Sequence, residues 1–130
     1  MSSAVAVALV IVSHSAKLAE GVVELAGQMA KDVQFRAAGG TEDGGIGTSF
    51  DAVFSAVEEL TAAGHQVAIL TDLGSADMTV DTVLEMVDGD QVRHCRGPLV
   101  EGAVAAAVTA QVGGDLDAVE QAAKATDAFG

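Results

Sequence analysis

The sequence contains neither tryptophan nor tyrosine, only four phenylalanines, and a single proline and a single cysteine. One cysteine excludes an intramolecular disulfide framework and fits a reducing compartment, so we expect a cytoplasmic protein in which Cys95 is a small buried apolar residue. Half of the residues are hydrophobic, but most of these are Ala and Val. Such small side chains suit a β-sheet covered by closely packed helices.

Basic residues are also scarce, with six Lys and Arg against nineteen Asp and Glu, which gives a formal net charge of −13. This charge argues against binding to nucleic acid or to anionic membrane surfaces and favours a partner with a basic face. The apolar run at residues 4–12 is shorter than the ~20 residues that span a bilayer. It also lacks a basic preceding segment, so we expect neither membrane insertion nor a signal peptide.

Apolar runs alternate with amphipathic segments along the chain. Strands are predicted at residues 4–12, 33–37, 67–70 and 92–95, the first of them continuous in its hydrophobicity and therefore central and buried on both faces. Helices lie between the strands and after the last one, with residues 99–112 apolar over most of their length. The side chains expected to face inward are Leu18, Val22, Leu25 and Met29; Phe50, Val53, Phe54, Val57 and Leu60; Val80, Val83, Leu84 and Val87; and Leu116, Val119, Ala123 and Phe129.

Capping and breaking residues set the expected ends of these helices. Thr48 followed by Asp51 reads as a variant capping box, and Ser75, Pro98 and Asp115 are expected to begin the later helices. The expected stops are Gly64, Gly89 and the pair at residues 113–114.

This alternation predicts one α/β domain over residues 1–130. It is a three-layer, open and mainly parallel sheet with helices on both faces and a flavodoxin-like strand order beginning 2-1-3-4. The winding reverses between the first and third strands. Ligands of such sheets bind at that reversal, outside the carboxyl ends of the strands.

Three loops are expected to meet at that reversal: residues 13–15, 39–49 and 71–75. They bring His14 and Asp72 close together, with hydroxyl groups and the free N–H groups of helix N-termini around them. Such N–H groups favour an anion, phosphate above all.

Several known sites do not fit these loops. No lysine follows a glycine as a P-loop requires, and the "GGIGTSF" segment has Phe50 where the dinucleotide fingerprint needs glycine. The first strand ends in histidine rather than in the acidic residues of a receiver domain. No tight cluster of metal-ligating residues is present, so we predict no metal and no cofactor.

A neutral imidazole is a competent nucleophile toward phosphorus. If Asp72 accepts a hydrogen bond from one ring nitrogen of His14, the other nitrogen is free to attack. Ser15, Thr48 and Ser49 could then hold the phosphoryl group. The residues alone leave open that His14 is an ordinary polar residue at a strand end and Asp72 a turn or cap residue. Arg96 is placed near the mouth of the site, and no catalytic role is expected for His65 or His94.

Four segments, "VIVSHSAKLAEGVVELAGQMA", "AAGGTEDGGIGTSFDAV", "LTDLGSADMT" and "GPLVEGAVAAAV", resemble the mannose-type enzyme IIA domains of the sugar phosphotransferase system. Within that family they are most similar to the phosphotransferase subunits of phosphoenolpyruvate-dependent dihydroxyacetone kinases. The resemblance runs from residue 10 to about residue 108.

The resemblance implies that His14 is phosphorylated and that Asp72 is the carboxylate beside it. The segments "AAGGT" and "GTS" match the phosphate-side loops of the family. The complete set of expected phosphate-binding residues is Ser15, Gly39, Gly40, Thr41, Gly47, Thr48, Ser49, Gly74 and Ser75.

The implied partners are phospho-HPr as a separate donor and, as acceptor, ADP bound on the nucleotide-binding kinase subunit. The chain itself is expected to be a homodimer, with residues 99–112 as one candidate dimer face. Three alternatives remain: a mannose-type enzyme IIA that serves a sugar permease, a non-catalytic module that binds an anion or a partner, and a structural subunit with a vestigial site.

Overall fold

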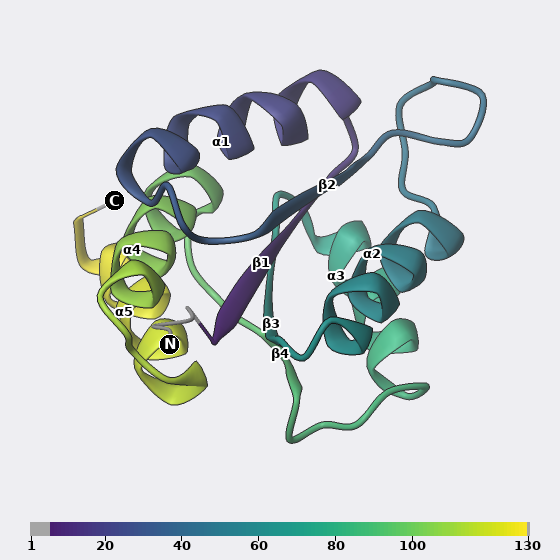
Figure 1. Cartoon of the computed structure of the whole chain (residues 1–130). Coiled ribbons are helices and arrows are strands. Elements are labelled where there is room, and N and C mark those ends of the chain that lie inside the picture. Colours follow the sequence, from purple (N-terminus) through teal and green to yellow (C-terminus); the bar gives the residue numbers. More distant parts are fainter. Residues whose placement is uncertain (1–5, 130) are drawn as a thin grey trace.

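The computed structural model describes residues 6–129, and its strands form a parallel sheet in the order β2-β1-β3-β4 (Figure 1). The strands are β1 (Val7–Ser13), β2 (Phe35–Gly39), β3 (Gln66–Thr71) and β4 (Val92–His94). The predicted α/β class and strand order are confirmed. β1 extends one residue beyond the predicted run, and Ala4 and Val5 of that run lie outside the described residues.

Strand β1 is the centre of the core, because it pairs with β2 on one side and with β3 on the other. All seven of its residues are buried. Its side chains alternate between two hydrophobic clusters, one on each face of the sheet. This is why the run at the start of the sequence is continuously apolar rather than alternating.

Helices cover both faces of the sheet (Figure 1). Helices α1 (Ala16–Met29), α4 (Leu99–Gln111) and α5 (Leu116–Ala125) pack on one face, and α2 (Phe50–Ala62) and α3 (Gly74–Leu84) pack on the other. A short 3-10 turn, Thr126–Phe129, follows α5, and the side chain of Phe129 lies outside the described part. No helix within residues 6–129 is long and apolar enough to cross a membrane.

The inner face of α1 differs from the predicted stripe. Ala19, Val22 and Ala26 are buried, whereas Leu18, Leu25 and Met29 are 42%, 44% and 56% exposed. Small alanines let the helix backbone approach the sheet and α4 closely, and this turns the larger side chains outward. Of the predicted α1 stripe, only Val22 is therefore a core residue.

Two helix starts also differ from prediction. Ser49, not Thr48, caps α2, because its extended backbone lets its hydroxyl accept from the N–H of Ala52 at 3.2 Å. Ser75 lies inside the first turn of α3 instead of capping it. The remaining caps, at Gly64 (φ +95°), Pro98 and Asp115, are confirmed, while α3 ends at Leu84, well before Gly89.

Cys95 behaves as predicted for a buried apolar residue. It is 1% exposed, and burial raises the pKa of its thiol to about 12. The thiol is therefore protonated and unreactive at neutral pH.

Gly39 marks the closest approach between a strand end and a helix start. A Cβ at this position would lie 2.5 Å from the carbonyl oxygen of Ser15 and 2.8 Å from the Cα of Ala16. Both neighbours are backbone atoms and cannot turn aside. Only glycine therefore lets β2 end directly against the first turn of α1.

We expect Gly39→Ala to lower the free energy of unfolding by about 1–3 kcal/mol, because overpacking against backbone displaces the start of α1. Gly21→Ala is the matched control, since a Cβ at that position in α1 meets nothing within 4 Å. The control should stabilise the helix by roughly 0.5–1 kcal/mol. Urea denaturation of both variants checks this, and equal effects would contradict it.

Candidate functional site

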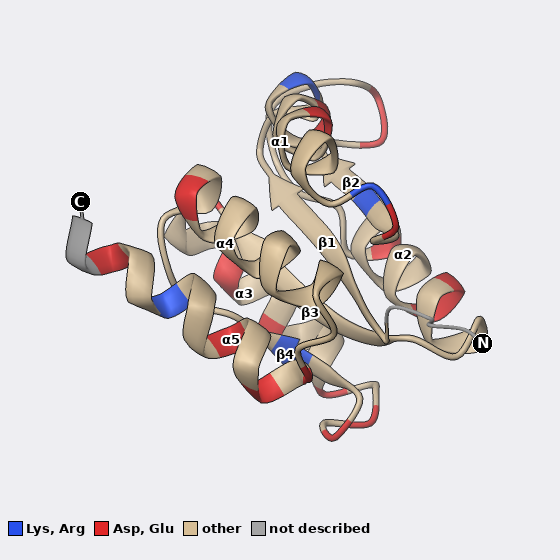
Figure 2. Cartoon of the chain, turned by 60° about the vertical axis from the view of Figure 1, so that its left-hand side comes forward, with Lys and Arg blue, Asp and Glu red and all other residues tan. Residues whose placement is uncertain are grey.

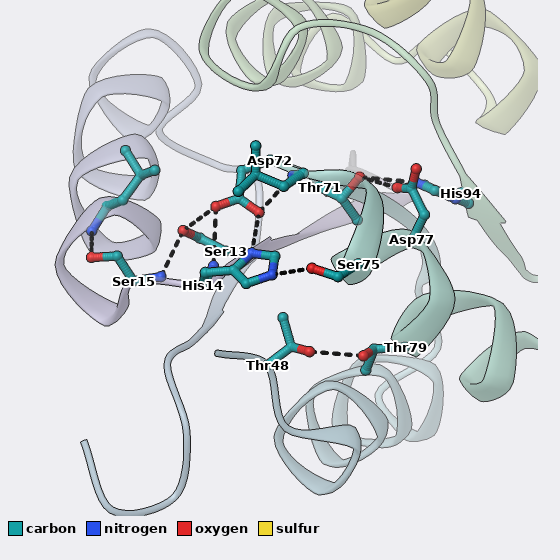
Figure 3. A network of polar contacts seen from close by, with 12 residues as sticks. Ser13, His14, Ser15, Thr48, Thr71, Asp72, Ser75, Asp77, Thr79 and His94 are labelled. Atoms are coloured by element: carbon teal, nitrogen blue, oxygen red, sulfur yellow. Dashed lines mark hydrogen bonds and ion pairs between the residues drawn. The ribbon is translucent and has the colours of Figure 1, made fainter. Parts of the chain in front are cut away.

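His14 and Asp72 meet at the carboxyl edge of the sheet (Figure 3). His14 follows β1 and Asp72 follows β3, and the last paired residues of these neighbouring strands are Val12 and Thr71. Continuing this register places Ser13 opposite Asp72 and His14 one residue further along at the same edge of the sheet. The ring Nδ1 of His14 lies 3.0 Å from Oδ1 of Asp72, and both side chains are largely buried, with 17% and 12% exposed. The expected proximity of these two residues is found.

The carboxylate of Asp72 faces donors on both of its oxygens. Oδ2 accepts from the Ser13 hydroxyl at 2.8 Å and from the backbone N–H of His14 at 3.0 Å. Oδ1 accepts from the N–H of Leu73 at 2.8 Å and faces the His14 ring. Burial raises the pKa of Asp72, but the hydrogen bonds from His14, Ser13 and Leu73 outweigh it and hold the pKa below its ordinary value.

The ionised carboxylate fixes which ring nitrogen of His14 carries the proton. An ionised carboxylate only accepts, so Nδ1 must donate to it. The lone pair of the neutral ring then resides on Nε2. This nitrogen is not bare: it contacts the hydroxyl of Ser75 in the first turn of α3, and that hydroxyl is the donor. Ser75 must turn aside before Nε2 can form a new bond.

The loop between β2 and α2 is fastened to the end of β1 by two backbone hydrogen bonds. The N–H of Gly47 donates to the carbonyl of His14 at 2.9 Å, and the N–H of Gly40 donates to the carbonyl of Ser13 at 3.2 Å. Gly40 and Gly47 both have positive φ, +78° and +149°. Glycine allows the backbone to take these conformations next to the His14 ring.

The predicted phosphate-side hydroxyls are placed nearby, but most have local partners. Ser15 caps α1 by accepting from the N–H of Leu18 at 3.2 Å. The Thr41 hydroxyl accepts from the N–H of Gly45 at 2.9 Å, and Ser49 caps α2. The Thr48 hydroxyl pairs with that of Thr79 at 2.8 Å. Among the predicted hydroxyls, Ser75 is the one that touches the His14 ring.

An open depression of about 720 Å³ lies along the loop between β2 and α2, and His14 is not among its lining residues. Glu42, Asp43 and Asp51 contribute three carboxylates to it, which repel an anion. Its full lining is Thr41, Glu42, Asp43, Gly45, Ile46, Thr48, Ser49, Phe50 and Asp51. The depression is therefore unsuited to phosphate.

A second polar network anchors α3 beside the site (Figure 3). Asp77 accepts from the Thr71 hydroxyl at 2.5 Å, lies 3.2 Å from Nε2 of His94, and pairs with Arg96 at 3.3 Å. Burial, with the charge of Arg96 added to it, lowers the pKa of His94 and favours its neutral ring. Arg96, expected near the mouth of the site, is thus engaged by Asp77.

Ser13 and Asp77 are polar contributors to these networks that were not predicted as site residues. Ser13 carried a usable signal, because it is the one hydroxyl residue at the end of an otherwise apolar buried strand. No signal identified Asp77, because its partners come from β3 and β4. Within the described residues, no group of three or more His, Cys, Asp or Glu side chains could hold a metal ion.

Comparisons with known proteins give a consistent family assignment. Residues 8–120 match the EIIA-man family, described as "PTS system fructose IIA component". A relative from Lactococcus lactis, "PTS-dependent dihydroxyacetone kinase, phosphotransferase subunit DhaM", is 41% identical over 113 residues, covering 87% of this chain and 89% of its own. A relative from Escherichia coli, "PEP-dependent dihydroxyacetone kinase, phosphoryl donor subunit DhaM", is 43% identical over 118 residues. That match covers 85% of this chain but only 25% of the longer relative.

Solved structures show the same fold. The crystal structure of a protein of unknown function superposes with a TM-score of 0.83 at 29% identity, covering 92% of this chain and 93% of that one. A sigma-54 interaction domain protein from Enterococcus faecalis gives a TM-score of 0.73 at 16% identity, with 93% and 90% covered. The second likeness concerns the fold alone.

Asp72 should contribute to stability in a pH-dependent way. Its folded-state pKa is lowered, so its contribution is present above the unfolded value of about 3.9 and is lost as the pH falls through the folded value. We expect the wild type to exceed Asp72→Asn in unfolding free energy at pH 7, with the difference shrinking below about pH 4. Denaturation at several pH values checks this. Glu85→Gln, at an exposed position, is the control, and a pH-independent difference for Asp72→Asn would contradict the expectation.

Proposed function

Because this chain belongs to the EIIA-man family, the PTS system fructose IIA components, we propose that it relays phosphoryl groups in a phosphoenolpyruvate-dependent dihydroxyacetone kinase system. His14 accepts the group from phospho-HPr and passes it to ADP held on the nucleotide-binding kinase subunit. The observation that carries this proposal is the hydrogen bond between Asp72 and Nδ1 of His14, which leaves the lone pair on Nε2. The names of the relatives as phosphotransferase and phosphoryl donor subunits support it.

In the first step, the Nε2–P bond forms as the N–P bond of the donor's phosphohistidine breaks. Nδ1 keeps its proton throughout, and the negative charge of Asp72 offsets the positive charge that develops on the ring. In the second step, a terminal phosphate oxygen of ADP attacks the phosphorus, and the electrons of the Nε2–P bond return to the ring. Positioning and fixed dipoles supply most of the catalysis in such loose transition states.

The first turn of α3 is the best-placed holder of the phosphoryl oxygens. Its N-cap residue, Leu73, provides no side-chain hydrogen bond to the helix, so the N–H groups of Gly74 and Ser75 remain available to an anion. The Ser75 hydroxyl already touches Nε2 and can turn to donate to a phosphoryl oxygen. The remaining predicted loop residues hold the surrounding backbone in place. They are Ser15, Gly39, Gly40, Thr41, Gly47, Thr48 and Ser49.

Charge favours basic partners in the cytoplasm. Asp and Glu are spread over the described helices and loops while Lys and Arg are few (Figure 2). An acidic surface attracts the basic face of a donor and speeds its association, more strongly at low salt.

The proposal also includes a homodimer, with the outer side of α1 and α4 as its interface. Helix α4 carries a single charged residue, Glu101, and its outward-facing Val108 is 39% exposed. Neighbouring α1 adds the exposed Leu18, Leu25 and Met29. A helix that is apolar on all sides is normally covered, and a second copy of the chain would cover this one.

Leu25→Glu combined with Val108→Glu should convert the dimer to a monomer, because two carboxylates would be buried in each half of the interface. Light scattering after size-exclusion chromatography measures the mass. Met86→Glu is the control, since Met86 is 64% exposed and follows α3 on the opposite face. A wild-type mass equal to one chain would contradict the dimer.

His14→Ala should abolish phosphoryl uptake from enzyme I, HPr and phosphoenolpyruvate, because the histidine at the end of β4, His94, is buried and its Nε2 is engaged by Thr71 and Asp77. The measurement is an acid-labile mass gain of one phosphoryl group. His65→Ala, at a partly exposed position between α2 and β3, should retain full uptake. Uptake by His14→Ala at the wild-type rate would overturn the relay.

Transfer onward tests the acceptor. The phosphorylated protein should lose its label to ADP on the dihydroxyacetone kinase subunit and not to a mannose-type permease component. Transfer to the permease component alone would identify the sugar-transport branch of the family. Stable retention with both acceptors would indicate that this chain does not serve as a relay.

A further inference from the structure

We propose that Ser13 is a positioning residue for phosphoryl transfer: its buried hydroxyl holds Asp72 in the orientation that keeps the proton on Nδ1 and the lone pair on Nε2 of His14. This inference rests on the proposed relay function. It assigns to the end of β1 a task that is separate from binding phosphate or a partner.

Ser13 is enclosed at the point where three elements meet (Figure 3). Its side chain is fully buried, and its hydroxyl donates to Oδ2 of Asp72 at 2.8 Å. The hydroxyl oxygen of Ser13 also accepts from the backbone N–H of Ser15, just before α1, at 3.0 Å. One hydroxyl therefore ties the carboxylate after β3 to the end of β1 and the start of α1.

Without the Ser13 hydroxyl, the two oxygens of Asp72 would face unequal numbers of hydrogen-bond donors. Oδ1 faces the N–H of Leu73 and the His14 ring, whereas Oδ2 would keep only the backbone N–H of His14. A carboxylate held by two donors on each oxygen cannot turn about its Cβ–Cγ bond without breaking several hydrogen bonds. Loss of the Ser13 donor removes one of the two hydrogen bonds to Oδ2. The carboxylate can then turn more easily, which weakens the hydrogen bond between Oδ1 and Nδ1 of His14.

Ser75 cannot compensate for such loosening. Its hydroxyl donates to Nε2 when that nitrogen carries the lone pair, and it accepts from Nε2 when that nitrogen carries the proton. Ser75 thus favours neither tautomer. The choice falls to Asp72, and a ring with its proton on Nε2 has no lone pair there for phosphorus.

Ser13→Ala and Ser13→Cys test the proposal together. Cysteine is slightly larger than serine and fills its space, but its thiol is a weak donor, so a donor role predicts that Cys resembles Ala, whereas a packing role predicts that Cys resembles Ser. Val119→Ala, buried in α5 away from the site, is the control for lost stability alone.

The first readout is the tautomer of His14, observed by ¹⁵N NMR of the imidazole at a pH where the ring is neutral and with no phosphoryl donor present. The wild type and Val119→Ala should show the proton on Nδ1, and both Ser13 variants should show a mixture. Signals of His65 and His94 serve as internal references and should not move.

The second readout is steady-state phosphoryl uptake from phospho-HPr. Both Ser13 variants should have kcat lowered roughly tenfold, the equivalent of one charge-assisted hydrogen bond, with KM for the donor unchanged. Wild-type tautomer and wild-type kcat in Ser13→Ala, or a wild-type result in Ser13→Cys with a loss in Ser13→Ala, would overturn the positioning role. Failure of the wild type to be phosphorylated would overturn the relay instead and leave the tautomer result standing.

Discussion

The hydrogen bond between Asp72 and Nδ1 of His14 is the contact on which the proposed chemistry at this edge of the sheet depends. It exists because β1 and β3 are neighbouring parallel strands that end at the same edge of the sheet, although His14 and Asp72 lie 58 residues apart in the chain. The strand order 2-1-3-4 therefore determines which side chains meet at this edge, because it places β1 beside β3. An order that did not place β1 beside β3 would separate the ring from the carboxylate and leave the proton free to occupy either nitrogen.

The surroundings of this pair divide into a rigid side and an adaptable side. Backbone N–H groups and the buried Ser13 hydroxyl fix the carboxylate, and the Thr71–Asp77–His94 network anchors the beginning of α3. The Ser75 hydroxyl, by contrast, can rotate at little cost. Fixed groups hold the proton while one mobile donor faces Nε2, which is the arrangement that the proposed transfer site requires.

Sequence reasoning predicted the sheet order and the pairing of His14 with Asp72, because both follow from alternating hydrophobic periods and from the topology of parallel sheets. It was wrong about the inner face of α1, where alanines rather than Leu18, Leu25 and Met29 face the core. It was also wrong about Thr48 and Ser75 as caps, since one residue of register decides which hydroxyl reaches an N–H group. Ser13 and Asp77 depend on partners far along the chain, which local patterns do not encode.

The hydrogen bond from Gly47 to the carbonyl of His14 links the glycine-rich loop mechanically to the residue that carries the imidazole. The side chain next to that glycine, Ile46, is 78% exposed at the tip of the loop. A protein that presses on Ile46 therefore pushes, through two adjacent peptide groups, on the backbone that carries the imidazole. The position of the loop and the orientation of the imidazole are coupled by this route.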